Sequence, residues 1–211
     1  MQRWVPSREW RGEDAYIIGG GPSLRHFDWD LVRGKNTIGC NSAFLLGADV
    51  VRILLWADIE WWYKIGERRT AEFGGRVVGC PDKDHFPLEG CPWLLTLPRQ
   101  ETGLGHGALG YNFNTGSLAI NLALILGARR VFLLGFDMKL SQDGRPNWHD
   151  LRHEAGSPEV YSRFKEGFQT VARVLPQEFP GREVWNVTDD SELEAFPKLS
   201  TWRHFTGREK A

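Results

Sequence analysis

Residues 15–24 read AYIIGGGPSL, and this stretch decides the class of fold. The apolar run at 15–18 suits a short strand that is covered on both faces. Gly19–Gly21 follow at once, and Pro22 and Ser23 then stand where the first turn of a helix is expected. A strand, a glycine turn and a helix in this order predict a βαβ unit built around a parallel sheet.

The chemistry of this turn suits a phosphate group. Glycines permit positive φ and let backbone N–H groups approach a ligand, and Ser23 adds a hydroxyl near the positive end of a helix. The turn is not a Walker A loop, because no Gly-Lys-Ser/Thr follows, and it is not a GxGxxG fingerprint, because Leu24 takes the third glycine position. A tight turn without a ligand is the alternative. The residues that we expect to bind the phosphate of a nucleotide-type ligand are Gly19, Gly20, Gly21 and Ser23.

Apolar runs alternate with helical patterns along most of the chain, which is typical of an α/β protein. Helices are expected at Trp61–Phe73 and Leu118–Leu126, and an apolar stripe with helical spacing predicts another from Val160 to Leu175. Pro81–Pro92 and the glycine-rich stretch Arg99–Asn114 are expected to be loops, the second of a kind that often binds ligands. The expected strands are Tyr16–Ile18, Asn36–Cys40, Val50–Trp56, Arg76–Gly79, Trp93–Leu97, Val131–Leu134 and Glu183–Asn186.

These elements predict a single Rossmann-like α/β domain over residues 1–211, with a mostly parallel sheet and helices on both faces. Its core would span 15–190, between short flexible termini. The net charge is -1, from 26 basic and 27 acidic side chains, so no global field favours nucleic acid or an anionic membrane. Three cysteines without metal-site spacing indicate neither a disulfide framework nor a zinc site. No signal peptide or membrane span is recognisable, so we expect a cytoplasmic protein.

Polar side chains follow several of the predicted strands. Asn41, Asp58 and Asp137 each stand at a carboxyl end, where open α/β sheets place ligand groups. Asn41 or Asp58 could instead cap the helix that follows. Asp137 could hold a ribose hydroxyl, a metal ion or the turn itself.

A further group of small polar residues precedes the helix expected at Leu118–Leu126. Thr115 and Ser117, on either side of Gly116, can cap that helix. The same hydroxyl and N–H groups can face an anion at the positive end of the helix. We therefore expect Thr115, Gly116 and Ser117 to contribute to the ligand site.

Two histidines, His149 and His153, lie in the segment Asn147–Glu154 after the strand that ends before Asp137. Imidazole is well matched to proton transfer near neutral pH. On a helix the two rings would share a face and could chelate a metal, but HDLRH lacks the glutamate of HExxH. An acid/base or phosphate-contacting role is therefore favoured, with His106 of the glycine-rich loop as a further candidate.

Together, GGGPSL, CNSAF, WAD and NTGSLAINLALILGARRVFLLGFDM resemble the superfamily shared by bacterial CMP-sialic-acid sialyltransferases and the family named for archaeal 6-hydroxymethylpterin diphosphokinase. The sequence looks closest to small phage-encoded members labelled as morphogenetic proteins, and the similarity spans residues 16–186. It implies a general base at His153 or His149, and it maps the aspartate that ends a central strand onto Asp137, which we expect to be a catalytic residue together with these histidines. The nucleotide contacts that it implies are Gly19, Gly21, Ser23, Asn41, Thr115, Gly116 and Ser117.

Two departures from the sialyltransferase pattern affect the expected chemistry. Gly20 and Asp58 stand where that family tends to have asparagine. A carboxylate near phosphates favours a divalent metal, so Mg²⁺ held by Asp58 and Asp137 is one expectation.

The leading hypothesis is a transferase that uses a nucleotide or nucleotide-sugar donor, a glycosyltransferase of CMP-sugar type with a histidine base. The alternatives are a Mg²⁺-dependent, ATP-using diphosphokinase-like phosphotransferase, and a non-catalytic phage assembly or host-interaction protein. In a phage setting the location would be the host cytoplasm. The acceptor stays open among a modified nucleobase, a glycan and a metabolite, as does assembly into a homo-oligomer.

Overall fold

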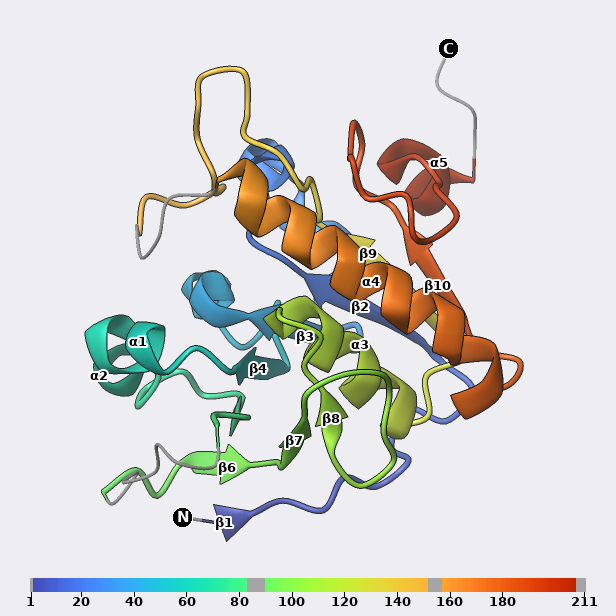
Figure 1. Ribbon diagram of the computed structural model, residues 1–211. Helices are drawn as coiled ribbons and strands as arrows, with labels where there is room; N and C mark the ends of the chain where they lie inside the picture. Colours follow the sequence, from blue (N-terminus) through green and yellow to red (C-terminus); the bar gives the residue numbers. More distant parts are fainter. Residues whose placement is uncertain (1, 83–89, 152–156, 208–211) are drawn as a thin grey trace.

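The computed structural model describes residues 2–82, 90–151 and 157–207 (Figure 1). Its centre is an eight-stranded sheet in the order β1-β6-β5-β4-β3-β2-β9-β10, and every neighbouring pair runs parallel. This sheet is made of β1 (Gln2–Arg3), β2 (Asp14–Ile18), β3 (Thr37–Cys40), β4 (Ile53–Trp56), β5 (Arg76–Gly79), β6 (Leu94–Thr96), β9 (Arg130–Leu134) and β10 (Glu183–Asn186). The short strands β7 (Arg99–Gln100) and β8 (Leu109–Gly110) form a separate parallel pair.

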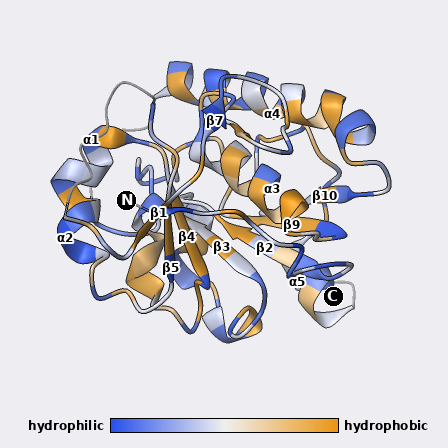
Figure 2. Ribbon diagram, turned by 90° about the horizontal axis from the view of Figure 1, so that it is seen from below, coloured by the Kyte–Doolittle hydropathy of each residue, from blue (hydrophilic) through white to orange (hydrophobic). Residues whose placement is uncertain are grey.

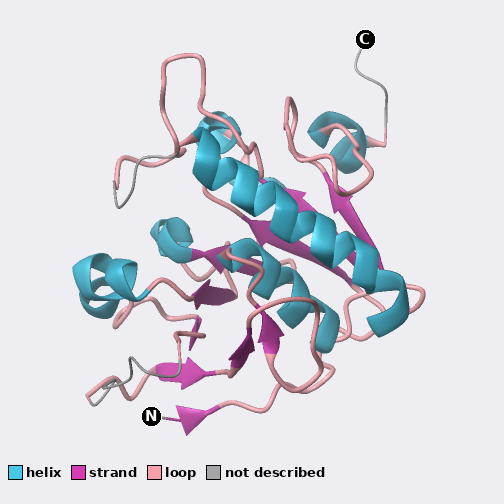
Figure 3. Cartoon of the chain, in the orientation of Figure 1, coloured by secondary structure: helices cyan, strands magenta, loops and turns pink. Residues whose placement is uncertain are grey.

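Helices cover both faces of the sheet, as the sequence predicts (Figures 1 and 3). The helices α3 (Thr115–Ile125) and α4 (Pro158–Glu178) pack on the face that buries Ile17, whereas α5 (Thr201–Thr206) packs on the opposite face. Figure 2 shows this separation, with the most hydrophobic residues concentrated in the strands and in α3. Successive strand residues point to opposite faces, so Ile17 and Ile18 belong to two different buried clusters. No helix within the described ranges is both long and apolar enough to cross a membrane.

All the strands expected from the sequence form, two of them with the expected bounds. Two helical expectations were wrong in detail. After the glycine turn the chain forms a five-residue 3-10 helix, Pro22–His26, instead of an α-helix. The expected helix at Trp61–Phe73 is divided into α1 (Ile59–Trp61), a π-helical turn at Trp62–Gly66 and α2 (Glu67–Arg69).

The π-helical turn has a physical cause in the neighbouring indoles. Trp61 and Trp62 are both fully buried, and Trp62 stacks on Trp56 with ring centroids 4.3 Å apart. Successive residues of a regular α-helix point roughly 100° apart, which makes it difficult to bury two large neighbouring side chains in one direction. The widened turn accommodates both.

The order of the strands creates a switch point between β2 and β9. From β2 the chain adds β3, β4, β5 and β6 on one side, and then returns to place β9 and β10 on the other. Ile18 pairs with Leu134 of β9 and with Gly39 of β3, so these strands end at nearly the same level. Ligands of open α/β sheets bind beyond the carboxyl ends of the strands at such a point.

Candidate functional site

A cavity of about 580 Å³ lies at this edge of the sheet, a size within the usual range for small-molecule sites. A smaller cavity of about 250 Å³ adjoins it, and Gly20, Asn41, Asp58 and Asn147 line both. The predicted site residues that line the larger cavity are Gly19, Gly20, Asn41, Asp58, Thr115 and Gly116, and those that line only the smaller one are Gly21, Asp137 and His149.

The glycine turn is bonded to the end of β9 rather than open along its length. Gly19 N donates to Leu134 O and Gly21 N donates to Gly135 O, each over 2.8 Å. None of the three glycines has positive φ, so the expected use of that conformation was wrong. Close approach requires glycine at two of the positions instead, because a Cβ on either Gly19 or Gly21 would lie 2.6 Å from Gly135 O. Of the three glycines, Gly20 alone lines both cavities.

Asp137 holds the glycine turn in place. Its buried carboxylate accepts hydrogen bonds from Ser23 N over 2.9 Å and from Ser23 Oγ over 2.8 Å. Burial raises the pKa of Asp137, and the two bonds from Ser23 act in the opposite direction. Ser23 lines neither cavity, and its hydroxyl, which we expected to face a phosphate, is directed at Asp137 instead.

The start of α3 differs from the expected cap. Asn114, not Thr115 or Ser117, is the N-cap, and its Oδ1 accepts from Ser117 N over 2.7 Å. The Ser117 hydroxyl is buried, accepts from Asn112 Nδ2 and donates to Gly110 O, so it faces the interior. Thr115 and Gly116 provide the first N–H groups of the helix, which have no partner within it, and both residues line the larger cavity. The positive end of α3 therefore faces this cavity.

Asn41 carries the clearest sign of a missing partner. Its Oδ1 is buried and has no hydrogen-bond partner in the part of the chain that the structure describes. Buried acceptors are nearly always bonded in folded proteins, to the protein, to water or to a ligand. Because Asn41 lines both cavities, its amide oxygen is placed to accept from a group bound there.

Backbone strain is concentrated around the larger cavity. Asn41 (φ 50°), Phe113 (φ 63°) and Met138 (φ 55°) all line it in the left-handed region, and Asn112 (φ 45°) directly precedes Phe113. Bulky residues rarely adopt this conformation, and such strain clusters at functional sites. The strain therefore marks this cavity independently of the sequence motifs.

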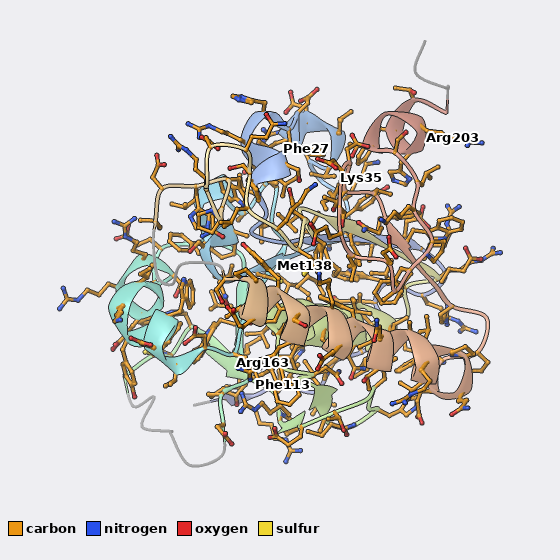
Figure 4. The ribbon with its side chains drawn as sticks, turned by 45° about the horizontal axis from the view of Figure 1, so that its top comes forward. Phe27, Lys35, Phe113, Met138, Arg163 and Arg203 are labelled. Carbon is orange, nitrogen blue, oxygen red and sulfur yellow. The ribbon has the colours of Figure 1, made fainter. Side chains whose placement is uncertain are left out.

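Two arginines border the larger cavity that the sequence analysis did not single out. The Arg99 guanidinium lies 4.2 Å from the centroid of the Tyr111 ring, and its Nη2 lies 2.9 Å from Asp82 Oδ2. Arg163 of α4 lies 5.1 Å from the centroid of the Phe113 ring (Figure 4). Arg99 belongs to the glycine-rich stretch expected to bind a ligand, which was a signal. Arg163 is a polar residue between apolar positions of a helix and gave none.

Of the three candidate histidines, one lines a cavity, one lines neither cavity, and one lies outside the described residues. His149 lines the smaller cavity, and its neighbour Trp148 ties the segment to the glycine turn by donating from N to Gly20 O over 3.1 Å. Burial lowers the pKa of His149, which favours the neutral imidazole. Residues 147–151 form a loop rather than a helix, and His153 lies outside the described residues. His106 lines neither cavity and lies 3.5 Å from Glu178.

The carboxylates proposed as magnesium ligands have other partners. Asp58 Oδ1 accepts from Glu60 N and Trp61 N, so Asp58 caps α1, which was the alternative role. The Asp137 carboxylate accepts hydrogen bonds from Ser23 N and Ser23 Oγ. No group of three His, Cys, Asp or Glu side chains suited to a metal ion occurs among the described residues. This donor set does not favour a resident Mg²⁺, and the magnesium site stays a prediction.

Comparisons with known proteins give a likeness of fold. Neither a protein-family model nor a curated protein matches the chain. Among solved structures, it is similar to the MAf glycosyltransferase from Magnetospirillum magneticum AMB-1, with a TM-score of 0.60 and 16% sequence identity. The match covers 95% of this chain and 35% of that one, so the present chain spans about a third of the length of its structural neighbour. At this level of identity, the two proteins share a fold.

Proposed function

We propose that this chain is a glycosyltransferase-like transferase that binds a nucleotide-activated donor in the larger cavity. The observation that carries the proposal is the convergence of positive groups on that cavity, at the switch point of the sheet. The first N–H groups of α3, at Thr115 and Gly116, face it together with Arg163 and with Arg99, whose ion-pair partner Asp82 also lines the cavity. Such an arrangement suits the phosphate groups of a donor.

The same groups would stabilise the departing nucleotide. In the transfer, an acceptor hydroxyl oxygen bonds to the anomeric carbon of the sugar while the bond from that carbon to the phosphate oxygen breaks. The electron pair of the broken bond leaves with the nucleotide, where N–H groups and arginines offset the developing negative charge. The fold shared with a glycosyltransferase supports this class of reaction in general terms. A CMP-sugar is the leading donor on the sequence resemblance alone.

His149 is our candidate for the general base. It lines the smaller cavity, which adjoins the proposed donor site and would take the acceptor. Burial lowers its pKa, which favours the neutral imidazole, the form that takes the proton of the acceptor hydroxyl. Asp137, which the sequence grouped with the histidines, is assigned to the structure of the glycine turn instead.

Isothermal titration calorimetry tests the proposal directly. The purified protein is titrated with CMP, UDP and ADP and with their sugar derivatives, each in the presence and in the absence of EDTA. We expect binding of at least one nucleotide, with an affinity that EDTA does not change. Absence of binding by all of them would overturn the proposal and favour a non-catalytic protein. Binding that is lost in EDTA would favour the Mg²⁺-dependent phosphotransferase.

A further inference from the structure

Phe113 holds an aromatic ring at the edge of the larger cavity. Its side chain is 46% exposed and lines the cavity, whereas the other exposed large apolar residues of the described chain do not. Aromatic rings of this size are normally used to bury apolar surface. A ring left half-exposed at a ligand cavity is therefore available for contact with a ligand.

The backbone under this ring is strained and firmly held. Asn112 and Phe113 are successive left-handed residues, a conformation that a phenylalanine seldom adopts. The buried Asn112 side chain fixes the segment, because its Oδ1 accepts from Gly103 N over 2.7 Å and its Nδ2 donates to Gly103 O over 2.8 Å. Asn112 O also accepts from Asn114 Nδ2 over 3.0 Å. Such bonds over-determine the conformation, so the ring is held in place before any ligand arrives.

The surroundings of the ring resemble a stacking site. The Arg163 guanidinium covers it from α4, 5.1 Å from the ring centroid (Figure 4). No carboxylate of the described residues forms an ion pair with Arg163. Phe113 and Gly116 are three residues apart, hence at most roughly 11 Å apart along an extended chain. The backbone that carries the ring and the start of α3 thus lie within the dimensions of one nucleotide.

We propose that Phe113 is the platform on which the planar base of the nucleotide stacks, with Arg163 on its ring and the phosphate at the start of α3. This inference rests on the proposed function and adds to it the residue that recognises the base. Stacking on an aromatic ring is available to every base, because each has a π face. The platform therefore supplies affinity for nucleotides over sugar phosphates without choosing among the four bases.

The test compares ligands with and without a base. The wild type and the Phe113→Ala and Phe113→Trp variants are titrated with the 5′-monophosphates of cytidine, uridine, adenosine and guanosine, and with ribose 5-phosphate. Phe113→Ala is expected to lower the affinity for the tightest-binding nucleotide by about 5- to 150-fold, the range typical of base–aromatic stacking. Phe113→Trp retains the nucleotide affinity. The affinity for ribose 5-phosphate stays within about twofold in both variants, because it makes no stacking contact.

A stability measurement separates stacking from packing. Phe113→Gly removes the left-handed strain, so its thermal midpoint should equal or exceed that of the wild type while its nucleotide affinity falls as in Phe113→Ala. A lower midpoint with parallel losses for all ligands would show that the ring only packs.

Two other results would overturn the inference in distinguishable ways. If the wild type binds nucleotides and Phe113→Ala binds them equally well, the stacking platform alone is wrong. If the wild type binds no nucleotide, the proposed function falls and the platform falls with it. Should ribose 5-phosphate bind too weakly to measure, the contrast between alanine and tryptophan decides. Nucleotide affinity that is kept in Phe113→Trp and lost in Phe113→Ala supports stacking. An equal loss of affinity in both variants contradicts it.

Discussion

Asp137 and Ser23 lie 114 positions apart in the sequence, and the carboxylate of Asp137 accepts both the N–H and the hydroxyl hydrogen bond of Ser23. These bonds join the loop after β9 to the turn after β2, across the switch point of the sheet. Gly21 packs against this carboxylate, and a Cβ placed on it would lie 1.8 Å from Asp137 Oδ2. One wall of the candidate site is therefore built by a contact between two loops that no local sequence pattern encodes.

Gly21→Ala is expected to destabilise the protein by roughly 1–3 kcal/mol, because the added methyl group must displace the Asp137 carboxylate and Gly135 O. Urea unfolding followed by circular dichroism measures the change. Gly20→Ala is the matched control, since its Cβ would approach only the end of the Asn147 side chain, at 3.0 Å. Equal stability of the two variants would show that the Asp137 contact does not constrain the turn.

Asp137→Asn should change how stability depends on pH. Burial raises the pKa of Asp137 in the folded protein, so the folded state binds this proton more tightly than the unfolded chain. The contribution of Asp137 to stability is thus greatest below the usual carboxyl pKa and is lost as the pH rises through the raised pKa. As the pH rises from the usual carboxyl pKa through the raised one, the free energy of unfolding of the wild type should fall relative to that of Asp137→Asn. At higher pH the difference between the two proteins should stay constant. Urea unfolding at a series of pH values tests this, and a wild type that gains stability there would contradict it.

The sheet could be predicted from the sequence because buried parallel strands are short, apolar and separated by recognisable turns. Arg76–Gly79 and Glu183–Asn186 form strands with the bounds that their sequence indicates. The α-helix predicted after the glycine turn does not form. The chain from Pro22 forms a short 3-10 helix instead, in which Ser23 is held by the carboxylate of a residue distant in the sequence. Propensity describes local preference, and this contact is not local.

The grouping of residues around the candidate cavity could be predicted best where those residues follow strands. Asn41 and Asp58 stand directly beyond β3 and near the end of β4, and the topology brings them to one cavity. Arg163 was missed because it lies on α4, far along the chain from the strand ends that line the cavity. An arginine on an amphipathic helix is also ordinarily a solvated residue. Phe113 was missed for another reason, since an apolar residue in a loop gives no indication of its backbone conformation.

Arg163→Ala is expected to weaken binding of the nucleotide by about 10- to 100-fold, the usual loss when a charged hydrogen-bond donor is removed. The thermal midpoint should change little, because the side chain is exposed. Titration calorimetry at two salt concentrations measures the effect, and the salt dependence of the remaining affinity should be smaller. Arg173→Ala, on an exposed position of the same helix that lines neither cavity, is the control. Similar losses in both variants would point to a general charge effect.

His149→Gln tests the assignment of the general base. Hydrolysis of the bound donor by water should slow by about 100- to 10,000-fold in kcat, with KM nearly unchanged, because the imidazole acts on the proton and not on the donor. In the wild type, the rate should fall on the acidic side with an inflection below the usual histidine pKa, since burial lowers the pKa of His149.

Two further histidines serve as comparisons for that measurement. His26→Gln alters an exposed ring that lines neither of the two cavities, so its rate should match that of the wild type. His153→Gln, at a position outside the described residues, asks whether the other histidine of the segment is the base. Loss of the acidic inflection in His153→Gln, with a normal profile in His149→Gln, would reassign the role.

Asn41→Gly and Asn41→Ala separate backbone strain from ligand contact. Asn41 has a φ of 50°, which glycine adopts freely and alanine does not. Asn41→Gly should therefore keep the free energy of unfolding within about 1 kcal/mol of the wild type, whereas Asn41→Ala loses roughly 1–2 kcal/mol to strain. Both variants remove the buried Oδ1 that has no partner among the described residues. Both should therefore lower the affinity for the nucleotide by about 10-fold. Urea unfolding and titration calorimetry on the same preparations give the two quantities. A Gly variant that is as stable as the wild type and binds as tightly would show that Asn41 shapes the turn after β3 without contacting the ligand.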